Sequence, residues 1–422
     1  MFRVVLELHA VGQGLFYSGK LGSFDFVYDC GTTSNRIYLD QSVQSYLNTV
    51  TGNEIDLLIL SHLHKDHTSG INSLLDRTRI KYVVLPYITP IERAILLASL
   101  NNVWSKSWYA EFLKDPIEYL LGENRDRVKK IVFITQGDND GRMSRVREGE
   151  ENHRENQEND DQVTIDDQSF QMQDDHRTSK VIEESEKEFQ NFLGKILIKQ
   201  HTGLLNLNKK WIFKFYNMPI ARSILTSFEH CFNSLPGMNK GTVTSDDLKK
   251  LLAQPANLTK LRECYKFVNK DINYTSLLTY HGASTSRHAL DCYSLYGPTP
   301  SYSYSINQIP YIQLKLTKQT SCSCFLTGDV DLKVGWTEMS RHFKFEFEDL
   351  STVLVPHHGS PDSWNRDILK TACNAEVWYI SAGLHNKYSH PSVKVIRDIR
   401  LANRNVLISN EFTSFAENYL LS

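Results

Sequence analysis

Four side chains that bind metal ions in proteins lie within six residues of one another, directly after an apolar run. Residues 55–70 have the sequence IDLLILSHLHKDHTSG, in which His62, His64, Asp66 and His67 follow the run. On an extended chain His62 and His64 project to the same side, and a turn would bring Asp66 and His67 beside them. Imidazole and carboxylate groups suit zinc, manganese or iron, and four of them exceed what one tetrahedral ion takes from one loop. We therefore expect two divalent metal ions, Zn or Mn; the alternative is a polar loop whose histidines only form hydrogen bonds.

The sequence around this motif predicts strands that alternate with helices. Helices are expected around residues 42–46, over 90–121, and over 391–402 with Ser392 as an N-cap. Strands alternating with helices indicate an α/β fold whose sheet is covered on its faces. The expected strands are short β-rich runs bounded by turn residues. They cover residues 1–8, 24–28, 55–60, 81–86, 130–135, 209–217, 276–280, 311–317, 321–327, 351–355 and 376–381.

Length and composition limit the class of protein. With 422 residues, 41% of them hydrophobic, the chain can bury a sizeable core, and we expect one domain over residues 1–422. The longest apolar runs, residues 55–60 and 82–88, fall far short of the roughly 18 residues that a membrane span needs. Glu7 and His9 interrupt the first apolar run too early for a secretory signal. Seven cysteines, an odd number without framework spacing, suit a reducing compartment, so we expect a cytoplasmic protein without membrane contact.

Charge is distributed unevenly along the chain. The formal net charge is -2, but residues 138–188 hold 17 acidic and 7 basic residues, which leaves 40 basic and 32 acidic residues elsewhere. This acidic stretch is poor in aromatic and β-branched residues, so we expect a disordered insert. Residues 220–269 predict a second, helical insert. Either insert could bind a protein partner.

The motif HLHKDH at residues 62–67 resembles the signature of the metallo-β-lactamase superfamily. The resemblance implies a four-layer αββα sandwich that holds one or two metals at the edge of its sheets. It implies that His62 and His64 bind the first metal and that Asp66 and His67 bind the second. Residues 27–31 (VYDCG) resemble the early strand whose Asp, here Asp29, orients the histidine loop. Residues 325–329 (FLTGD) resemble the strand whose terminal Asp, here Asp329, bridges both metals.

Five further segments resemble ComEC-type proteins of this superfamily, the hydrolase domains attached to, or separated from, the bacterial DNA-uptake channel. His357, His358 and Asp66 are the expected catalytic residues. Either histidine could bind a phosphate oxygen or protonate a leaving alkoxide, and the alternative is that one of the two is an ordinary buried or supporting histidine. His390 is expected to be a metal ligand or a group beside the phosphate. The segments are VGQG at 11–14, NYTSLL at 273–278, VPHHGS at 355–360, ISAG at 380–383 and NKYSHP at 386–391.

Other side chains in these segments are expected to support the metals or meet the substrate, namely Asp29, Asn273, Ser360 and Lys387. Asn273 stands near the position of the superfamily's third metal histidine, so water, Asn273 or His281 would complete the first site. Ala10 and Leu15 stand where the opening turn usually carries acidic residues. A looser first site favours manganese over zinc.

These features predict a metal-dependent hydrolase, best explained as a nuclease or phosphodiesterase that attacks nucleic acid or a nucleotide with a metal-bound hydroxide. A bacterial defence system is one context for such an enzyme. The superfamily also hydrolyses esters, lactones, lactams and thioesters, so the first alternative is a hydrolase of a small lactone, ester or thioester. The second alternative is a non-catalytic partner subunit, against which the intact set of metal-binding residue types argues.

Overall fold

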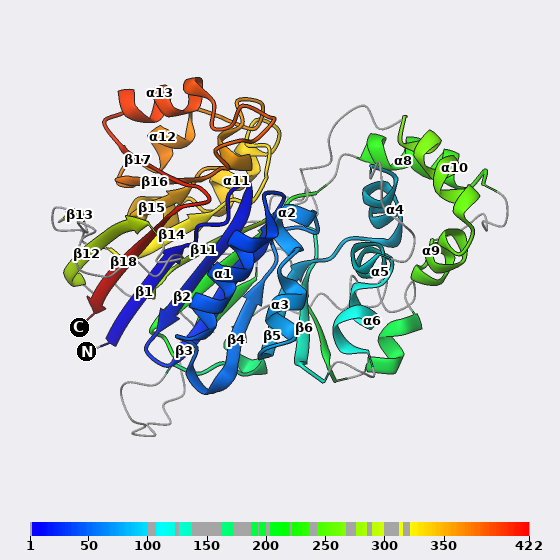
Figure 1. Cartoon of the computed structure of the whole chain (residues 1–422), viewed down its shortest axis with the longest axis horizontal. Helices are drawn as coiled ribbons and strands as arrows, with labels where there is room; N and C mark the ends of the chain where they lie inside the picture. The colour runs from blue at the N-terminus through cyan, green and yellow to red at the C-terminus, as the bar shows by residue number, and fades with distance from the viewer. Residues whose placement is uncertain are drawn as a thin grey trace.

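Two β-sheets stacked face to face form the centre of the protein, with helices on both outer surfaces (Figure 1). The computed structural model describes residues 2–99, 107–122, 126–136, 163–171, 187–192, 194–199, 203–219, 222–235, 243–266, 276–284, 289–298, 312–314 and 321–421. Over these residues the architecture is an α/β fold, as the sequence pattern predicted, in the αββα arrangement that the resemblance implied.

The first sheet contains both parallel and antiparallel strand pairs. Its described strands follow the order β13 (Ile312–Leu314), β12 (Ala289–Pro298), β18 (Thr413–Leu421), β1 (Phe2–Leu8), β2 (Gly14–Leu21), β3 (Phe24–Thr32), β4 (Glu54–Ile59), β5 (Arg79–Pro86), β6 (Val128–Ile134) and β8 (Ile196–Lys199). The second sheet follows the order β17 (Asn405–Ser409), β16 (Val377–Ser381), β15 (Thr352–Leu354), β14 (Ser323–Leu326), β11 (Leu277–Ala283), β10 (Trp211–Asn217), β9 (Leu204–Leu207) and β7 (Phe170–Gln171).

An apolar core fills the space between the sheets. In β4, Leu57 and Ile59 point into this core, while Leu58 packs against the helices on the other face. Successive side chains of a strand alternate between its two faces, and here both faces are covered, which explains why residues 57–60 are all apolar. Phe26 of β3 meets Phe213 of β10 across the core, with ring centroids 5.0 Å apart.

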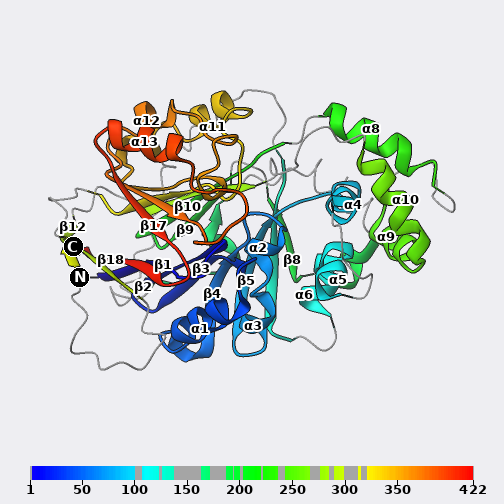
Figure 2. The same ribbon diagram turned by 45° about the horizontal axis from the view of Figure 1, so that its top comes forward.

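Helices cover the outer faces of both sheets (Figure 2). α1 (Arg36–Leu47) and α3 (Ile71–Leu75) lie on the first sheet. α11 (Trp336–His342), α12 (Ile368–Thr371) and α13 (Val393–Leu401) lie on the second. The Ser392 side chain accepts a hydrogen bond from the amide of Lys394, so Ser392 caps α13 as the sequence predicted.

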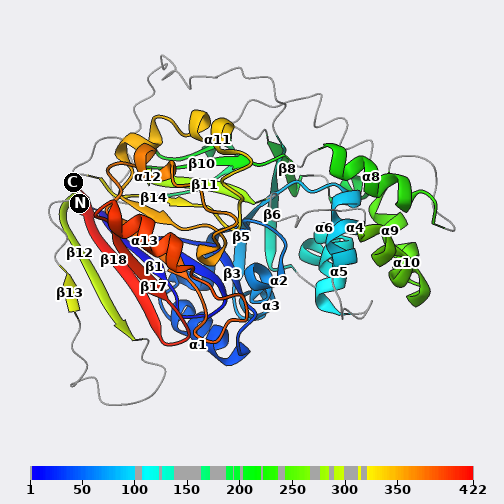
Figure 3. The ribbon, with the colours of Figure 1, turned by 90° about the horizontal axis from the view of Figure 1, so that it is seen from above.

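Six helices from two distant parts of the sequence form a helical lobe at one side of the sandwich (Figures 1 and 3). The lobe consists of α4 (Pro90–Ser99), α5 (Trp108–Lys114), α6 (Pro116–Leu121), α8 (Arg222–Phe232), α9 (Ser245–Leu252) and α10 (Pro255–Tyr265). The Arg93 guanidinium donates to the Lys114 carbonyl and to Ser245 Oγ, at 2.6 and 2.8 Å, and so joins the two parts. A disulfide, which cysteine spacing did not predict, links Cys231 of α8 to Cys264 of α10.

A short part of the acidic stretch 138–188, residues 163–171, packs on the edge of the second sheet. Phe170 and Val163 are buried in the core between the sheets, and β7 pairs with β9. Asp167 accepts a hydrogen bond from Tyr82 and pairs with Lys130. Burial of Val163 and Phe170 thus holds residues 163–171 against the edge of the second sheet. Residues 137–162 and 172–186 lie outside the described residues.

The last strand, β18, lies between β12 and β1 in the first sheet, and the sequence analysis expected no strand over its residues. Glu417 points inward with the apolar residues of β18, and its carboxylate accepts hydrogen bonds from Tyr379, Tyr419 and Thr352 at 2.6–3.1 Å. A carboxylate at an inward position weakens the alternating pattern by which strands are found. None of the described helices is long and apolar enough to cross a membrane.

Candidate metal centre

Side chains from separate strand ends meet at one edge of the sandwich. Asp29 lies near the end of β3, His62 follows β4, Asp329 follows β14, and His357 and His358 follow β15. β3 and β4 run parallel, as do β14 and β15, so within each pair the carboxyl ends lie on the same side. Such an edge is where α/β proteins place ligands.

A short helix, α2 (Lys65–Thr68), presents Asp66 and His67 at this edge. The helix begins after His64, whose carbonyl accepts hydrogen bonds from the His67 amide at 3.1 Å and from Thr68 Oγ1 at 2.9 Å. α2 packs so closely on β3 that a Cβ added to Gly31 would lie 2.5 Å from the carbonyl carbon of Asp66. The position therefore needs glycine, which lets two backbones approach.

Asp29 fixes two of the histidines through a chain of hydrogen bonds. Its Oδ1 accepts from the Ser61 amide at 2.6 Å, and its Oδ2 accepts from Ser61 Oγ at 2.5 Å and from His67 Nδ1 at 2.7 Å. Because Ser61 Oγ donates its proton to Asp29, it must accept from His62 Nδ1, 2.8 Å away. Both imidazoles therefore carry their proton on Nδ1 and a lone pair on Nε2.

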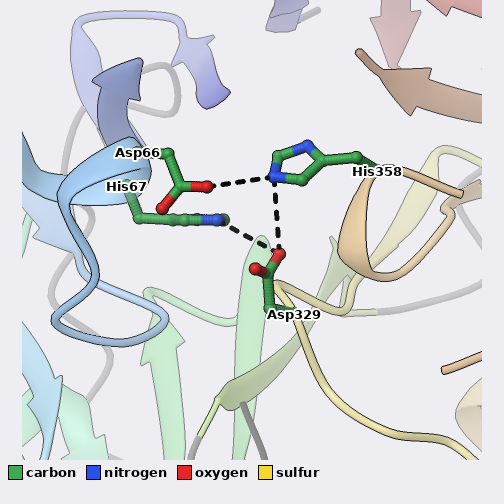
Figure 4. Close-up of side chains that lie close together, drawn as sticks. All are labelled: Asp66, His67, Asp329 and His358. Carbon is green, nitrogen blue, oxygen red and sulfur yellow. Dashed lines mark hydrogen bonds and ion pairs between the residues drawn. The ribbon is translucent and has the colours of Figure 1, made fainter. Parts of the chain in front are cut away.

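His358 is held in the same tautomer by a backbone carbonyl. Its Nδ1 lies 2.7 Å from the carbonyl oxygen of Ser381, which can only accept. The lone pair on Nε2 then faces Asp66, whose Oδ2 lies 3.3 Å away (Figure 4).

Asp329 is the carboxylate on which these lone pairs converge. Its Oδ1 lies 3.1 Å from His67 Nε2 and 3.8 Å from His358 Nε2, and its Oδ2 lies 3.7 Å from His62 Nε2. Figure 4 shows Asp329 below His67 and His358, with its carboxylate directed at both rings. Lone pairs facing carboxylate oxygens repel one another unless a proton or a metal cation lies between them.

The donor atoms form two overlapping groups with the dimensions of metal sites. Within each group one ligand atom per residue lies within 4.8 Å of all the others. The groups are Asp66, His67, Asp329 and His358, and His62, His64 and Asp66. The buried Nε2 of His62 has no hydrogen-bond partner among the described residues, although burying an unpaired nitrogen is costly. These residues fit one or two divalent cations with mixed imidazole and carboxylate ligands.

The electrostatic field of the cluster also favours a cation. Burial alone would lower the pKa of His67 and of His358, but the nearby carboxylates outweigh it and raise both pKa values. Burial lowers the pKa of His62 well below its usual value, assisted by His67 and His64. For Asp329, the charges of His67, His357 and His358 outweigh burial and hold the carboxyl pKa well below its usual range. Without a metal, protons on His67 and His358 would thus balance the carboxylates.

Residues 22–133 match the family model described as the metallo-beta-lactamase superfamily. The chain has a metallo-β-lactamase fold. The matched segment runs from the turn before β3 to β6, so it contains the complete His62–His67 motif. Most members of this superfamily are metal-dependent hydrolases that bind divalent metals.

Two solved structures match the chain at low similarity. The metallo-beta-lactamase fold protein YhfI from Bacillus subtilis is 9% identical over 99% of this chain and 100% of that chain, with a TM-score of 0.35. A long form RNase Z from yeast is 10% identical over 97% of this chain and 37% of that chain, with a TM-score of 0.26. Both TM-scores lie below 0.5, so neither likeness bears on the substrate. No curated protein sequence matches the chain.

At the rim of the metallo-β-lactamase site, two of the predicted histidines lie side by side outside both ligand groups. His357 Nδ1 lies 2.9 Å from Ser363 Oγ, and its Nε2 lies 3.9 Å from Asp329 Oδ2. The ring of His390 lies 5.6 Å from that of His357 and stacks on Tyr388. Burial and the nearby His357 and His358 lower the pKa of His390 to about 4, so this ring is neutral at pH 7.

The remaining predicted site residues lie further from the ligand groups. The buried Ser360 donates its amide to the His357 carbonyl at 2.9 Å and thus shapes the turn. The exposed Lys387 holds its ammonium 5.3 Å from the centre of the Tyr388 ring. Asn273 lies outside the described residues. His281 is buried between aromatic rings of both sheets, where its Nε2 lies 3.2 Å from the Tyr17 hydroxyl, so it does not complete the first site.

Serines that the sequence analysis did not select hold this site together. Ser61 connects Asp29 to His62, and Ser276 Oγ accepts from the Asp329 amide at 3.0 Å and lies 3.4 Å from His62 Nδ1. Both stand next to predicted motifs in the sequence, but serine is too common for adjacency to identify it. Ser363, six residues after His357, lies in no motif, so nothing in the sequence indicated its contact with His357.

Proposed function

We propose that this chain is a metal-dependent hydrolase that cleaves phosphodiester bonds in nucleic acid or a nucleotide, with two divalent ions, Zn or Mn, as cofactors. The proposal rests on one observation above all: three imidazole lone pairs, fixed by hydrogen bonds on the far nitrogens, face the carboxylates of Asp66 and Asp329 in a buried cluster. Divalent cations bound here would satisfy the lone pairs and the carboxylates together.

Each ligand group would hold one ion. His62 and His64 would bind the first ion, and Asp66 and His67 would bind the second. His358 would also bind the second ion, because its Nε2 lies 3.3 Å from Asp66 Oδ2. Asp329 lies within reach of both histidine sets and would bridge the two ions. Asp29 would orient His67 and, through Ser61, His62.

Two bound divalent ions supply Lewis acidity, which activates water near neutral pH and draws electrons from a phosphoryl group. The residues of the chain do the rest. The hydrogen bonds of Asp29 and Ser61 hold the imidazoles in place before substrate binds. His357, with Nε2 at the rim and Nδ1 held by Ser363, is placed to bind a phosphate oxygen or to give a proton to the leaving alkoxide. Neutral His390 lies beside it and would contact the same phosphate.

A phosphodiester substrate is supported by charge and by motif. Outside residues 138–188 the chain carries 40 basic and 32 acidic residues, a balance that attracts polyanions. The segments around His357 and His390 resemble those of ComEC-type hydrolases, and we propose that the chain belongs to this subgroup. Hydrolysis of a small lactone or thioester would need neither feature.

A metal-reconstitution assay tests the proposal. The protein is freed of metal, reloaded with Zn²⁺ or Mn²⁺, and assayed on single-stranded DNA, RNA, cyclic nucleotides, bis(p-nitrophenyl) phosphate and a lactone. We expect about two ions per chain and turnover of phosphodiesters that falls with ionic strength for polymeric substrates. Turnover of the lactone alone, or absence of bound metal, would refute the proposal.

A further inference from the structure

Leu63, the residue between the first two metal-binding histidines, is held by the helical lobe. Its carbonyl accepts a hydrogen bond from the hydroxyl of Tyr109 in α5, at 2.9 Å. Tyr109 is 3% exposed and Leu63 is 1% exposed, so the bond is shielded from water. A buried carbonyl that lost this partner would carry the full cost of desolvation.

The residues on either side are held by the sandwich instead. Ser61 fixes the His62 ring at the end of β4, and the His64 carbonyl belongs to the first turn of α2. The angle between the two imidazoles therefore depends on the backbone at Leu63. Their rings meet edge to face, with centroids 4.7 Å apart.

The side chain of Leu63 lies between the lobe and residues at the ends of β5 and β6. It lines a cavity together with Arg93 of α4 and Pro116 and Ile117 of α6. Arg93 in turn bonds to Ser245 of α9, so both parts of the lobe contribute to the surroundings of this residue.

We propose that Tyr109 is a positioning residue for the first metal ion: its hydroxyl fixes the His62–His64 segment and so couples occupancy of that ion to the helical lobe. The inference rests on the proposed function, because it requires that His62 and His64 bind metal. It assigns the lobe a role that neither the charge nor the motifs of the sequence indicated.

Cobalt(II) titration of the metal-free protein tests the inference, since the visible spectrum of cobalt reports the geometry of its ligands. Tyr109→Phe removes only the hydroxyl. We expect its dissociation constant for the first ion to rise about 10-fold or more, the effect typical of losing a group that supports a metal ligand. The constant for the second ion should stay unchanged. Tyr119→Phe is the matched control, because Tyr119 lies in α6 of the same lobe and its hydroxyl donates to Asn72 of α3 at 2.6 Å, not to the His62–His64 segment.

A second measurement needs no variant. Cobalt loading of the wild-type protein should slow amide hydrogen exchange in α5 more than in α10, because the bond from Tyr109 ties α5 to the loaded segment.

The outcomes separate the inference from the proposed function. If the wild-type protein binds cobalt and cleaves phosphodiesters, but Tyr109→Phe titrates like Tyr119→Phe and exchange in α5 does not change, the inference fails and the proposed function stands. If the wild-type protein binds no cobalt, both fail.

Discussion

Asp29 and His67 share a hydrogen bond of 2.7 Å between Oδ2 and Nδ1 in a place where neither residue is more than 1% exposed. The bond orders the site, because it decides which nitrogen of His67 is free. Asp29 reaches His62 through Ser61 in the same way, so one buried carboxylate sets two imidazoles.

Replacing Asp29 by asparagine should weaken metal binding. Asparagine has one acceptor oxygen in place of two, so it cannot accept from the Ser61 amide, Ser61 Oγ and His67 Nδ1 together, and the orientation of the imidazoles is weakened. We expect metal affinity to fall by about 10- to 100-fold, measured as metal content after dialysis against a graded chelator. Asp25→Asn, at the other end of the same strand and bonded to Lys20, is the control. Equal metal content in Asp29→Asn and the wild-type protein would contradict this role.

Replacing Asp66 by alanine should abolish hydrolysis with little loss of folding. The side chain of Asp66 is 20% exposed, and its removal leaves a gap at the site edge, not in the core. We expect bound metal to fall by about one ion per chain and the free energy of unfolding to change by less than about 1 kcal/mol. Asp76→Ala, a nearby exposed carboxylate, should change neither. Unaltered turnover in Asp66→Ala would rule out the two-metal proposal.

Gly31→Ala should disturb the metal site, because Gly31 of β3 contacts the helix α2 that carries Asp66 and His67. The added Cβ would lie 2.5 Å from the carbonyl carbon of Asp66, so α2 must move away from β3. We expect a loss of stability of about 2 kcal/mol or more, as for overpacked cores, together with loss of bound metal. Gly52→Ala strains the backbone but meets no atom within 4 Å, so it should cost stability and leave metal content unchanged. The same metal content in both variants would show that α2 tolerates the shift.

The buried His281 should make the protein less stable in acid. Burial lowers the pKa of His281 to about 3, below the usual value of 6.5. Between these two values the unfolded chain binds a proton that the folded chain does not, so stability is lost as pH falls from about 6.5 towards 3. The loss would reach at most about 5 kcal/mol.

Denaturant unfolding between pH 7 and pH 4 measures this effect. His281→Phe, which cannot take up a proton, should lose less stability over that range than the wild-type protein. His385→Phe replaces an exposed histidine and should follow the wild-type curve. Parallel curves for wild-type protein and His281→Phe would contradict the assignment.

Phe170→Ala should destabilise the sandwich although Phe170 lies in the acidic stretch. Phe170 is 3% exposed, and its ring centroid lies 5.3 Å from that of Tyr82 between the sheets. We expect a loss of about 3 kcal/mol in the free energy of unfolding. The exposed Gln168→Ala in the same segment should change it by less than about 0.5 kcal/mol. If both substitutions were silent, residues 163–171 would not belong to the core.

The sequence alone predicted an α/β fold, because its strands alternate with helices, and a cluster of metal-binding residues. Its resemblance to the metallo-β-lactamase superfamily implied the αββα arrangement. The apolar residues 57–60 mark a strand buried on both faces, and four possible ligands within six residues are rare without a metal. The same reasoning missed β18, because the inward Glu417 looks like a surface residue until Tyr379, Tyr419 and Thr352 are placed around it.

Only the tertiary structure decided which side chains meet and in what state. Ser61 and the Ser381 carbonyl fix the tautomers of His62 and His358, and Ser276 lies beside His62 although 214 residues separate them in the sequence. Tyr109 reaches Leu63 from a helix 46 residues away. Such contacts depend on the packing of separate elements, since a hydroxyl or a carbonyl is unremarkable in sequence and becomes specific only when burial leaves it a single partner.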